Sequence, residues 1–301
     1  MLFRTTMITT SQPANEQGFT LVELLVAMTL GLLIALVVTQ AYVSSTSVQR
    51  AQSDMVRLQE SARFAFDMLS HGLRKAGYKN AMAPGTGFCD PSPPARLLGR
   101  NDATGLNPAS TDLSGTTVTI LNSSDIVRIR YYGEGLAISP FTADGSILDC
   151  LGNAVAANVL VEDTFFVAAD TTNNNEPTLF CYTSNATASG SVPIIPGIES
   201  LQVLYGEDTT GVGTITKYVP AGLVSNMNNI RSLMLSVVVR TPSQVAADRS
   251  TTRVFNHFGT SYAPSNAAPA GDLGSVFSPA TDGRIRQQSS TTVALRNVCP
   301  T

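Results

Sequence analysis

The sequence has little of what enzymes and nucleic-acid-binding proteins usually need. It contains no tryptophan, only two histidines (His71 and His257) and 14% charged residues, with a net charge of −3. It carries no Walker loop, H-E-x-x-H or G-x-S-x-G motif. With this net negative charge, the chain has no excess of basic residues that would indicate nucleic-acid binding. We therefore expect a non-enzymatic protein with no nucleic-acid partner, no cofactor and no metal site, in which both histidines are structural.

Cysteine is also scarce, and its spacing is wide. The four cysteines are Cys89, Cys150, Cys181 and Cys299, and none forms a C-x-x-C pair. Wide spacing with few histidines favours disulfides over a zinc site, which predicts an oxidising compartment for this part of the chain. Three connectivities are possible. Pairing Cys150 with Cys181 closes the shortest loop open to Cys150 and leaves Cys89 and Cys299 as the second pair.

The acidic turn at residues 207–211 has two carboxylates, Glu207 and Asp208, and is a weak candidate for a calcium site. It lacks an EF-hand pattern, and short acidic turns are common. We interpret it as the tip of a hairpin between strands at residues 201–205 and 215–219.

A long apolar run lies near the start of the chain. Residues 19–38 are apolar except for two threonines, one glycine and Glu23. A helix of this length spans roughly 30 Å, about the thickness of a bilayer core. We therefore predict a membrane-spanning segment over residues 19–40. A charge in hydrocarbon costs about 2.5–3.5 kcal/mol on insertion scales, so Glu23 is expected to be functional.

The segment before this run is polar, and its only basic residue is Arg4. In a secretory signal peptide the apolar stretch precedes the cleavage site, whereas here it follows Gly18. The sequence G-F-T-L-V-E at residues 18–23 resembles the processing site of type IV prepilins. That resemblance implies cleavage between Gly18 and Phe19, N-methylation of Phe19, and a role for Glu23 in subunit assembly. An ordinary signal anchor is the alternative.

The helical pattern continues beyond the membrane segment. Apolar residues recur at spacings of three and four, which predicts one continuous stripe. The stripe consists of Val48, Ala51, Met55, Leu58, Ala62, Ala65, Leu69, Leu73 and Ala76. Gly77 follows a basic last turn, as is typical of a helix end. We predict one helix over residues 19–77 whose second half packs on a sheet, with a coiled coil as the alternative.

From residue 78 onward, period-two alternation replaces the helical pattern. In residues 124–132 apolar side chains alternate with Arg128 and Arg130, which predicts one buried and one solvated face. No long helical pattern separates the strands, so we expect antiparallel sheet and an α+β fold. The predicted strands are residues 117–121, 124–132, 164–168, 178–182, 199–205, 215–219, 232–240 and 291–295.

Several segments resemble the PilW-type minor pilins of type IV pili. The most specific is residues 57–78, which contains Q-E-S-A-R-F-A and ends R-K-A-G-Y; the others are residues 199–208, 230–240 and 291–297. The resemblance implies a type IV pilin-like fold in three parts. These are a prepilin leader at residues 1–18, a long helix at residues 19–77 that is transmembrane over residues 19–40, and a β-rich periplasmic domain at residues 78–301.

The same resemblance implies a function. The expected protein is a minor pilin that takes part in priming type IV pilus assembly, at the pilus tip. Its implied partners are other minor pilins, the major pilin, the prepilin peptidase, the inner-membrane assembly machinery and the lipid bilayer. The implied location is the inner membrane, in a single pass, and then the pilus. A minor pseudopilin of a type II secretion system and a tip adhesin are the alternatives.

Overall fold

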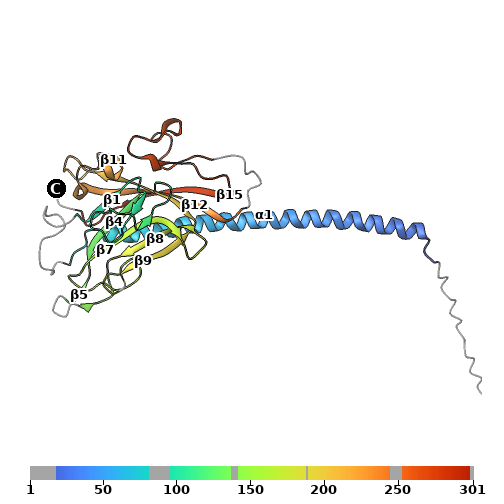
Figure 1. The fold of residues 1–301 in the computed structure, drawn as a ribbon, viewed down its shortest axis with the longest axis horizontal. Coiled ribbons are helices and arrows are strands. Elements are labelled where there is room, and N and C mark those ends of the chain that lie inside the picture. Colours follow the sequence, from blue (N-terminus) through green and yellow to red (C-terminus); the bar gives the residue numbers. More distant parts are fainter. Residues whose placement is uncertain (1–17, 81–94, 137–141, 188, 245–252, 299–301) are drawn as a thin grey trace, which may run out of the picture. The chain divides into compact units, whose positions relative to one another are not determined.

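The computed structural model describes residues 18–80, 95–136, 142–187, 189–244 and 253–298. The chain forms two compact units, residues 1–50 and residues 51–301. We call the second unit the body. The helix α1 spans Leu21–Lys75 and so contributes to both units (Figure 1).

The first part of α1 is apolar on all sides. Its large side chains from Leu21 to Val43 are about half exposed or more within the chain. In the described residues, α1 is the helix that is long and apolar enough to cross a membrane. An apolar surface of this kind needs lipid or other helices around it. The predicted helix is therefore present, beginning at Leu21 and not at Phe19.

The other end of α1 is set by Gly77. Its φ of +76° lies in the left-handed region, which glycine adopts without strain. The last helical turn carries Arg74 and Lys75, which suit the negative end of the helix dipole. The Gly77 amide donates to the Arg130 carbonyl at 2.8 Å, so the helix end is fixed to the neighbouring sheet.

Two antiparallel sheets make up most of the body. The first has the order β1-β4-β7-β8-β9, and the second has the order β11-β10-β12-β15 (Figure 1). The strands of the first sheet are β1 (Leu97–Arg100), β4 (Ile126–Tyr132), β7 (Leu160–Asp170), β8 (Glu176–Thr183) and β9 (Gly190–Pro196). Those of the second are β10 (Ile198–Glu207), β11 (Lys217–Val219), β12 (Ile230–Gln244) and β15 (Arg284–Ala294).

Three two-stranded ribbons and four short 3₁₀ helices complete the described body. The ribbons pair β2 (Gly105–Leu106) with β3 (Val118–Thr119), β5 (Gly135–Leu136) with β6 (Thr142–Ala143), and β13 (Phe255–Asn256) with β14 (Val276–Phe277). The 3₁₀ helices are η1 (Ala221–Leu223), η2 (Met227–Asn229), η3 (Pro264–Asn266) and η4 (Leu273–Ser275). All pairings between named strands are antiparallel, which confirms the prediction.

The eight predicted strands correspond to β3, β4, β7, β8, β10, β11, β12 and β15. The sequence missed β1 and β9, which are the two edges of the first sheet. Strand β9 contains Pro193 and Pro196, and proline is tolerated at a sheet edge because no donor is needed on the outer side. Composition therefore hid β9, since two prolines normally argue against a strand.

The second half of α1 packs on both sheets. Its stripe is buried from Leu58 onward together with apolar residues of β4, β7, β8, β10, β12 and β15 in one core. Gly72 is needed for this contact, because a Cβ there would lie 2.9 Å from the Phe165 ring. The stripe prediction is wrong before Leu58, since Met55 is 48% and Val48 53% exposed. The sheets cover the stripe that a coiled coil would have used.

The predicted solvated face of β4 is also wrong. Arg128 and Arg130 are 0% and 3% exposed, because residues 107–113 fold over them. Arg128 donates to the Pro108 carbonyl at 2.6 Å and to Thr164 Oγ1 at 2.7 Å. Burial lowers the pKa of Arg128. An alternating strand pattern cannot reveal such a cover, since an arginine can be buried once backbone carbonyls accept its hydrogen bonds.

The last strand, β15, leads to residues that are fastened to the end of α1. The Asn297 side-chain amide donates to the carbonyls of Arg74 at 3.4 Å and Ala76 at 3.3 Å. The buried Arg96 guanidinium donates to the Asn297 carbonyl and, at 2.6 Å, to the Ile230 carbonyl. Residues from the start, middle and end of the body therefore meet at one point.

Candidate functional site

The predicted processing site lies just before the first helical residue. Gly18 and Phe19 are exposed and non-helical, and Phe19 is 86% exposed. A Cβ added to Gly18 would meet nothing within 4 Å, and Gly18 has no positive φ that would require glycine. Packing among the described residues therefore gives no reason for glycine at this position. A requirement for it would have to come from another molecule.

Thr20 caps the start of α1 and contacts Glu23. The Glu23 amide donates to Thr20 Oγ1 at 3.3 Å, and the Thr20 hydroxyl donates to Glu23 Oε2 at 3.5 Å. This reciprocal contact satisfies one of the free amides of the first turn. Within the described chain, Glu23 has no ion pair, and its side chain is exposed. Its carboxylate is therefore accessible to another subunit.

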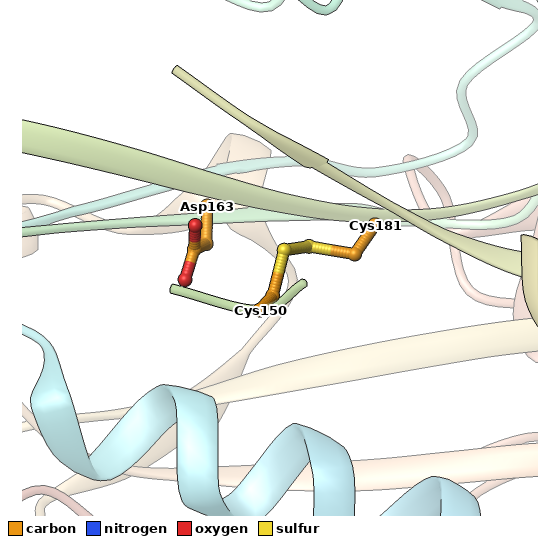
Figure 2. A group of neighbouring side chains, drawn as sticks. All are labelled: Cys150, Asp163 and Cys181. Atoms are coloured by element: carbon orange, nitrogen blue, oxygen red, sulfur yellow. A yellow bond between two sulfur atoms is a disulfide. The ribbon is translucent and has the colours of Figure 1, made fainter. Parts of the chain in front are cut away.

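The disulfide between Cys150 and Cys181 confirms the shorter-loop pairing. It joins a turn before β7 to the middle of β8, with 31 residues of sequence separation. Figure 2 shows Asp163 of β7 beside the two sulfur atoms. The two cysteines and this aspartate are close enough to suggest metal ligands, but a zinc site would need free thiolates. The predicted partners Cys89 and Cys299 lie outside the described residues.

Next to the disulfide, Asp163 joins the end of α1 to the first sheet. Its Oδ2 accepts a hydrogen bond from the Tyr131 hydroxyl at 2.7 Å and lies 3.4 Å from Lys75 Nζ. Lys75 also donates to the Leu148 carbonyl at 2.6 Å and lies 4.6 Å from the centre of the Tyr131 ring. The side chain of Asp163 is fully buried, and that of Lys75 is 10% exposed.

Burial and pairing act in opposite directions on this ion pair. Burial lowers the pKa of Lys75 and raises the pKa of Asp163, while the attraction between the two charges opposes both shifts. The pair is therefore stable only as a unit, because either charge alone would remain in a poorly solvated place. The sequence analysis missed this pair, although a lysine at a helix end and an aspartate inside an apolar strand were its two signals.

The two histidines lie in different surroundings. His71 is exposed on α1. His257 is 1% exposed, with the hydroxyls of Ser200 and Ser236 each 3.0 Å from one of its ring nitrogens. A serine beside a histidine can be a nucleophile and its base, but both serines are completely buried here.

We expect His257 to make the body acid-sensitive. Burial lowers its pKa from the usual 6.5 to about 3, so the unfolded state binds an extra proton between these values. Stability is then lost as pH falls from 6.5 towards 3. Between pH 7.5 and pH 4.5, the free energy of unfolding should fall less in His257→Gln than in wild type, by about 2–3 kcal/mol. Urea unfolding at both pH values measures this difference, and His71→Gln is the control. Equal falls in the free energy of unfolding for wild type and His257→Gln would contradict the prediction.

The acidic turn after β10 is the hairpin tip that was predicted. Glu207 accepts hydrogen bonds from the amides of Ser225 at 3.2 Å and Asn226 at 2.8 Å. Asp208 accepts from the amides of Gly211 at 2.8 Å and Gly213 at 2.7 Å. Asp208 thus holds the turn between β10 and β11, whereas Glu207 ties the end of β10 to the segment between η1 and η2.

Two family models match the chain, one near its start and one over its second half. The family model for Type IV Pilus-assembly protein W (PilW) matches residues 164–297, from within β7 to just beyond β15. The prokaryotic N-terminal methylation motif matches residues 13–39. The second half of the chain is therefore similar to the PilW family. The PilW match covers the whole second sheet, and the methylation motif covers Gly18, Phe19 and Glu23.

Comparisons with individual proteins leave this similarity unchanged. No curated protein matches it. Among solved structures, it is similar to a type IV-like pilin from Thermus thermophilus at 14% identity, with a TM-score of 0.42. That similarity covers 81% of this chain and 99% of the other. The match to Type IV Pilus-assembly protein W covers less than half of this chain.

Proposed function

We propose that this protein is a minor pilin that takes part in priming type IV pilus assembly and is located at the pilus tip. The observation that supports this best is the presence of both matches in one chain, the PilW model over the β-rich body and the methylation motif over the start of α1. The body offers no accessible nucleophile and base among the described histidines, which suits a structural subunit. Its partners would be other minor pilins and the major pilin.

The proposed route begins with proteolysis. The prepilin peptidase cuts after Gly18 and so removes residues 1–18, and Phe19 becomes the N-methylated N-terminus. The mature protein stays in the inner membrane through residues 19–40, with the body in the periplasm. The exposed, non-helical bond between Gly18 and Phe19 supports this step, since a protease needs an accessible extended segment. The disulfide Cys150–Cys181 supports an oxidising location for the body.

Glu23 would then drive the subunit from the bilayer into the filament. Its carboxylate has no ion-pair partner within the described chain and is costly in lipid. The amine created at Phe19 is a second charge at the edge of the same apolar phase. When the helices of two subunits pack together, the amine of one can pair with Glu23 of the other. That pairing removes two uncompensated charges at once.

We expect Glu23→Ala to be processed normally but lost from pili. An unpaired amine retains a cost of about 2.5–3.5 kcal/mol, equivalent to more than a tenfold loss of incorporation. Immunoblots of sheared pili and of membranes measure the two fractions. Glu60→Ala is the matched control, because Glu60 is also an exposed glutamate of α1. Incorporation of Glu23→Ala at the wild-type level would refute the role of Glu23.

Gene deletion tests the proposed function as a whole. We expect loss of surface pili and of twitching motility, with protein secretion unchanged. Secretion lost while twitching survives would instead assign the protein to a type II secretion system. Normal piliation with adhesion lost would indicate an adhesin.

A further inference from the structure

Three aspartates that are distant in the sequence meet at one end of the two sheets. Asp102 follows β1, Asp125 immediately precedes β4, and Asp272 immediately precedes η4. One carboxylate oxygen from each lies within 4.8 Å of the other two. Asp125 is 2% and Asp272 1% exposed, whereas Asp102 is partly exposed. Within the described chain none of the three has an ion pair with lysine, arginine or histidine.

Backbone amides fix two of these carboxylates in place. Asp125 Oδ2 accepts from the Val203 amide at 2.8 Å, and its Oδ1 accepts from the Asp102 amide at 3.1 Å. Asp102 accepts from the amides of Leu273 at 2.8 Å and Gly274 at 2.6 Å. The carboxylates are therefore held in position before any ligand arrives.

The third carboxylate, that of Asp272, lacks a hydrogen-bond partner for one of its oxygens. Asp272 Oδ2 accepts a hydrogen bond from the Tyr262 hydroxyl at 2.6 Å. Asp272 Oδ1 is buried and has no hydrogen-bond partner. A buried carboxylate oxygen without a partner is costly, more so beside two other carboxylates, because burial and like charge both disfavour the ionised form. This orphaned oxygen is a second observation, separate from the clustering, and it indicates that a ligand is needed.

The electrostatic shifts agree with a missing positive charge. Burial raises the pKa of Asp272 to about 6 and raises that of Asp125 well above its usual value. The charge of Asp272 adds to the shift of Asp125, and the charge of Asp102 adds to both. Burial and mutual repulsion therefore disfavour the ionisation of all three carboxyl groups together unless a cation is bound.

We propose that Asp102, Asp125 and Asp272 bind one calcium ion. Oxygens around Ca²⁺ at 2.3–2.6 Å lie at most about 5 Å apart, so three oxygens within 4.8 Å of one another fit one coordination sphere. Carboxylate oxygens are ligands for hard cations, and three of them on protein favour calcium over magnesium, which keeps most of its water. Asp102 reaches the surface and provides the entry path.

Calcium would cross-link three separate parts of the body. It would join the end of β1, the start of β4 and the segment that contains η4, which belongs to the long loop between β13 and β14. Without the ion, this segment is held by the hydrogen bonds from the Leu273 and Gly274 amides to Asp102 and by the Asn101 side chain, which donates to the Gly271 carbonyl at 2.5 Å. The predicted effect of the ion is therefore on the stability of the body.

Calcium titration of the full-length protein in detergent, after EDTA treatment, tests the site at pH 7.5. We expect calorimetry with CaCl₂ to show one bound ion per chain. At 100 times the dissociation constant, the melting temperature should rise by roughly 5–10 °C. A wild-type protein that shows neither binding nor a shift at millimolar calcium would overturn the proposal. A larger shift with MgCl₂ than with CaCl₂ would overturn the choice of calcium.

The variant Asp272→Asn separates the site from general folding effects. It removes one of three like charges, so without calcium it should melt at or above the temperature of calcium-free wild type, and its calcium shift should disappear. Asp144→Asn is the matched control, because Asp144 is an exposed turn aspartate that accepts from the Ser146 amide at 2.9 Å; it should keep the full calcium shift. A calcium shift retained by Asp272→Asn would overturn the assignment.

Discussion

Replacing Asp163 with alanine is expected to lower the free energy of unfolding by about 3–5 kcal/mol, because it leaves the Lys75 ammonium buried without its partner. The Tyr131 hydroxyl would also lose its acceptor. Equilibrium urea unfolding, followed by circular dichroism, measures the change. Tryptophan fluorescence is not an option, since the chain contains no tryptophan.

The matched variant is Lys75→Met combined with Asp163→Leu. Replacing both members of a buried pair by apolar residues of similar size is often neutral or stabilising. We therefore expect the double variant to recover most of the stability that Asp163→Ala loses. A loss below about 1 kcal/mol in Asp163→Ala would show that solvent reaches Lys75 and that the pair behaves like a surface ion pair.

Removing the disulfide by Cys150→Ala with Cys181→Ala is expected to cost about 3–4 kcal/mol. In the chain-entropy description, a cross-link closing a loop of 31 residues restricts the unfolded state by this amount. Alanine is preferred to serine because Cys181 is 0% exposed, and a hydroxyl there would have to be buried. Urea unfolding under non-reducing conditions measures the difference in free energy of unfolding between wild type and this double variant.

The control for the disulfide uses the other two cysteines. Cys89→Ala with Cys299→Ala removes the predicted second pair and leaves the bond between Cys150 and Cys181 intact, so it is the background in which that bond is tested. If adding Cys150→Ala and Cys181→Ala to this background costs no stability, the bond does not restrict the unfolded state as argued. A reversible loss on adding dithiothreitol to the control variant, which retains this bond, would support the main prediction.

Local patterns in the sequence were enough to predict the helix and most strands. The stripe that includes Leu69 and Leu73 marks the buried side of α1, and Gly77 marks its end. The sequence left three cysteine pairings open, and the disulfide found is the one that closes the shortest loop available to Cys150. These features depend on residues that are near one another in the chain, so periodicity and spacing can reveal them.

The features that the sequence did not reveal depend on segments that meet only in the fold. Arg128 and Arg130 looked solvated because nothing in β4 shows that residues 107–113 cover them. Asp102, Asp125 and Asp272 come from three loops with no shared motif, and their convergence depends on sheet order. Lys75 and Asp163 are 88 residues apart. Side-chain charge alone does not say which of these groups becomes buried.

The fastening of Asn297 to the end of α1 also constrains how the body folds. The hydrogen bonds from Asn297 to the carbonyls of Arg74 and Ala76 span 223 and 221 residues of sequence. Contacts of such long range form slowly, because closing a long loop costs entropy before the contact forms. Strand β15 is also the last partner of β12 in the second sheet. Synthesis must therefore pass the end of β15 before the second sheet is complete, and until then the edge of β12 that pairs with β15 has unpaired backbone donors and acceptors.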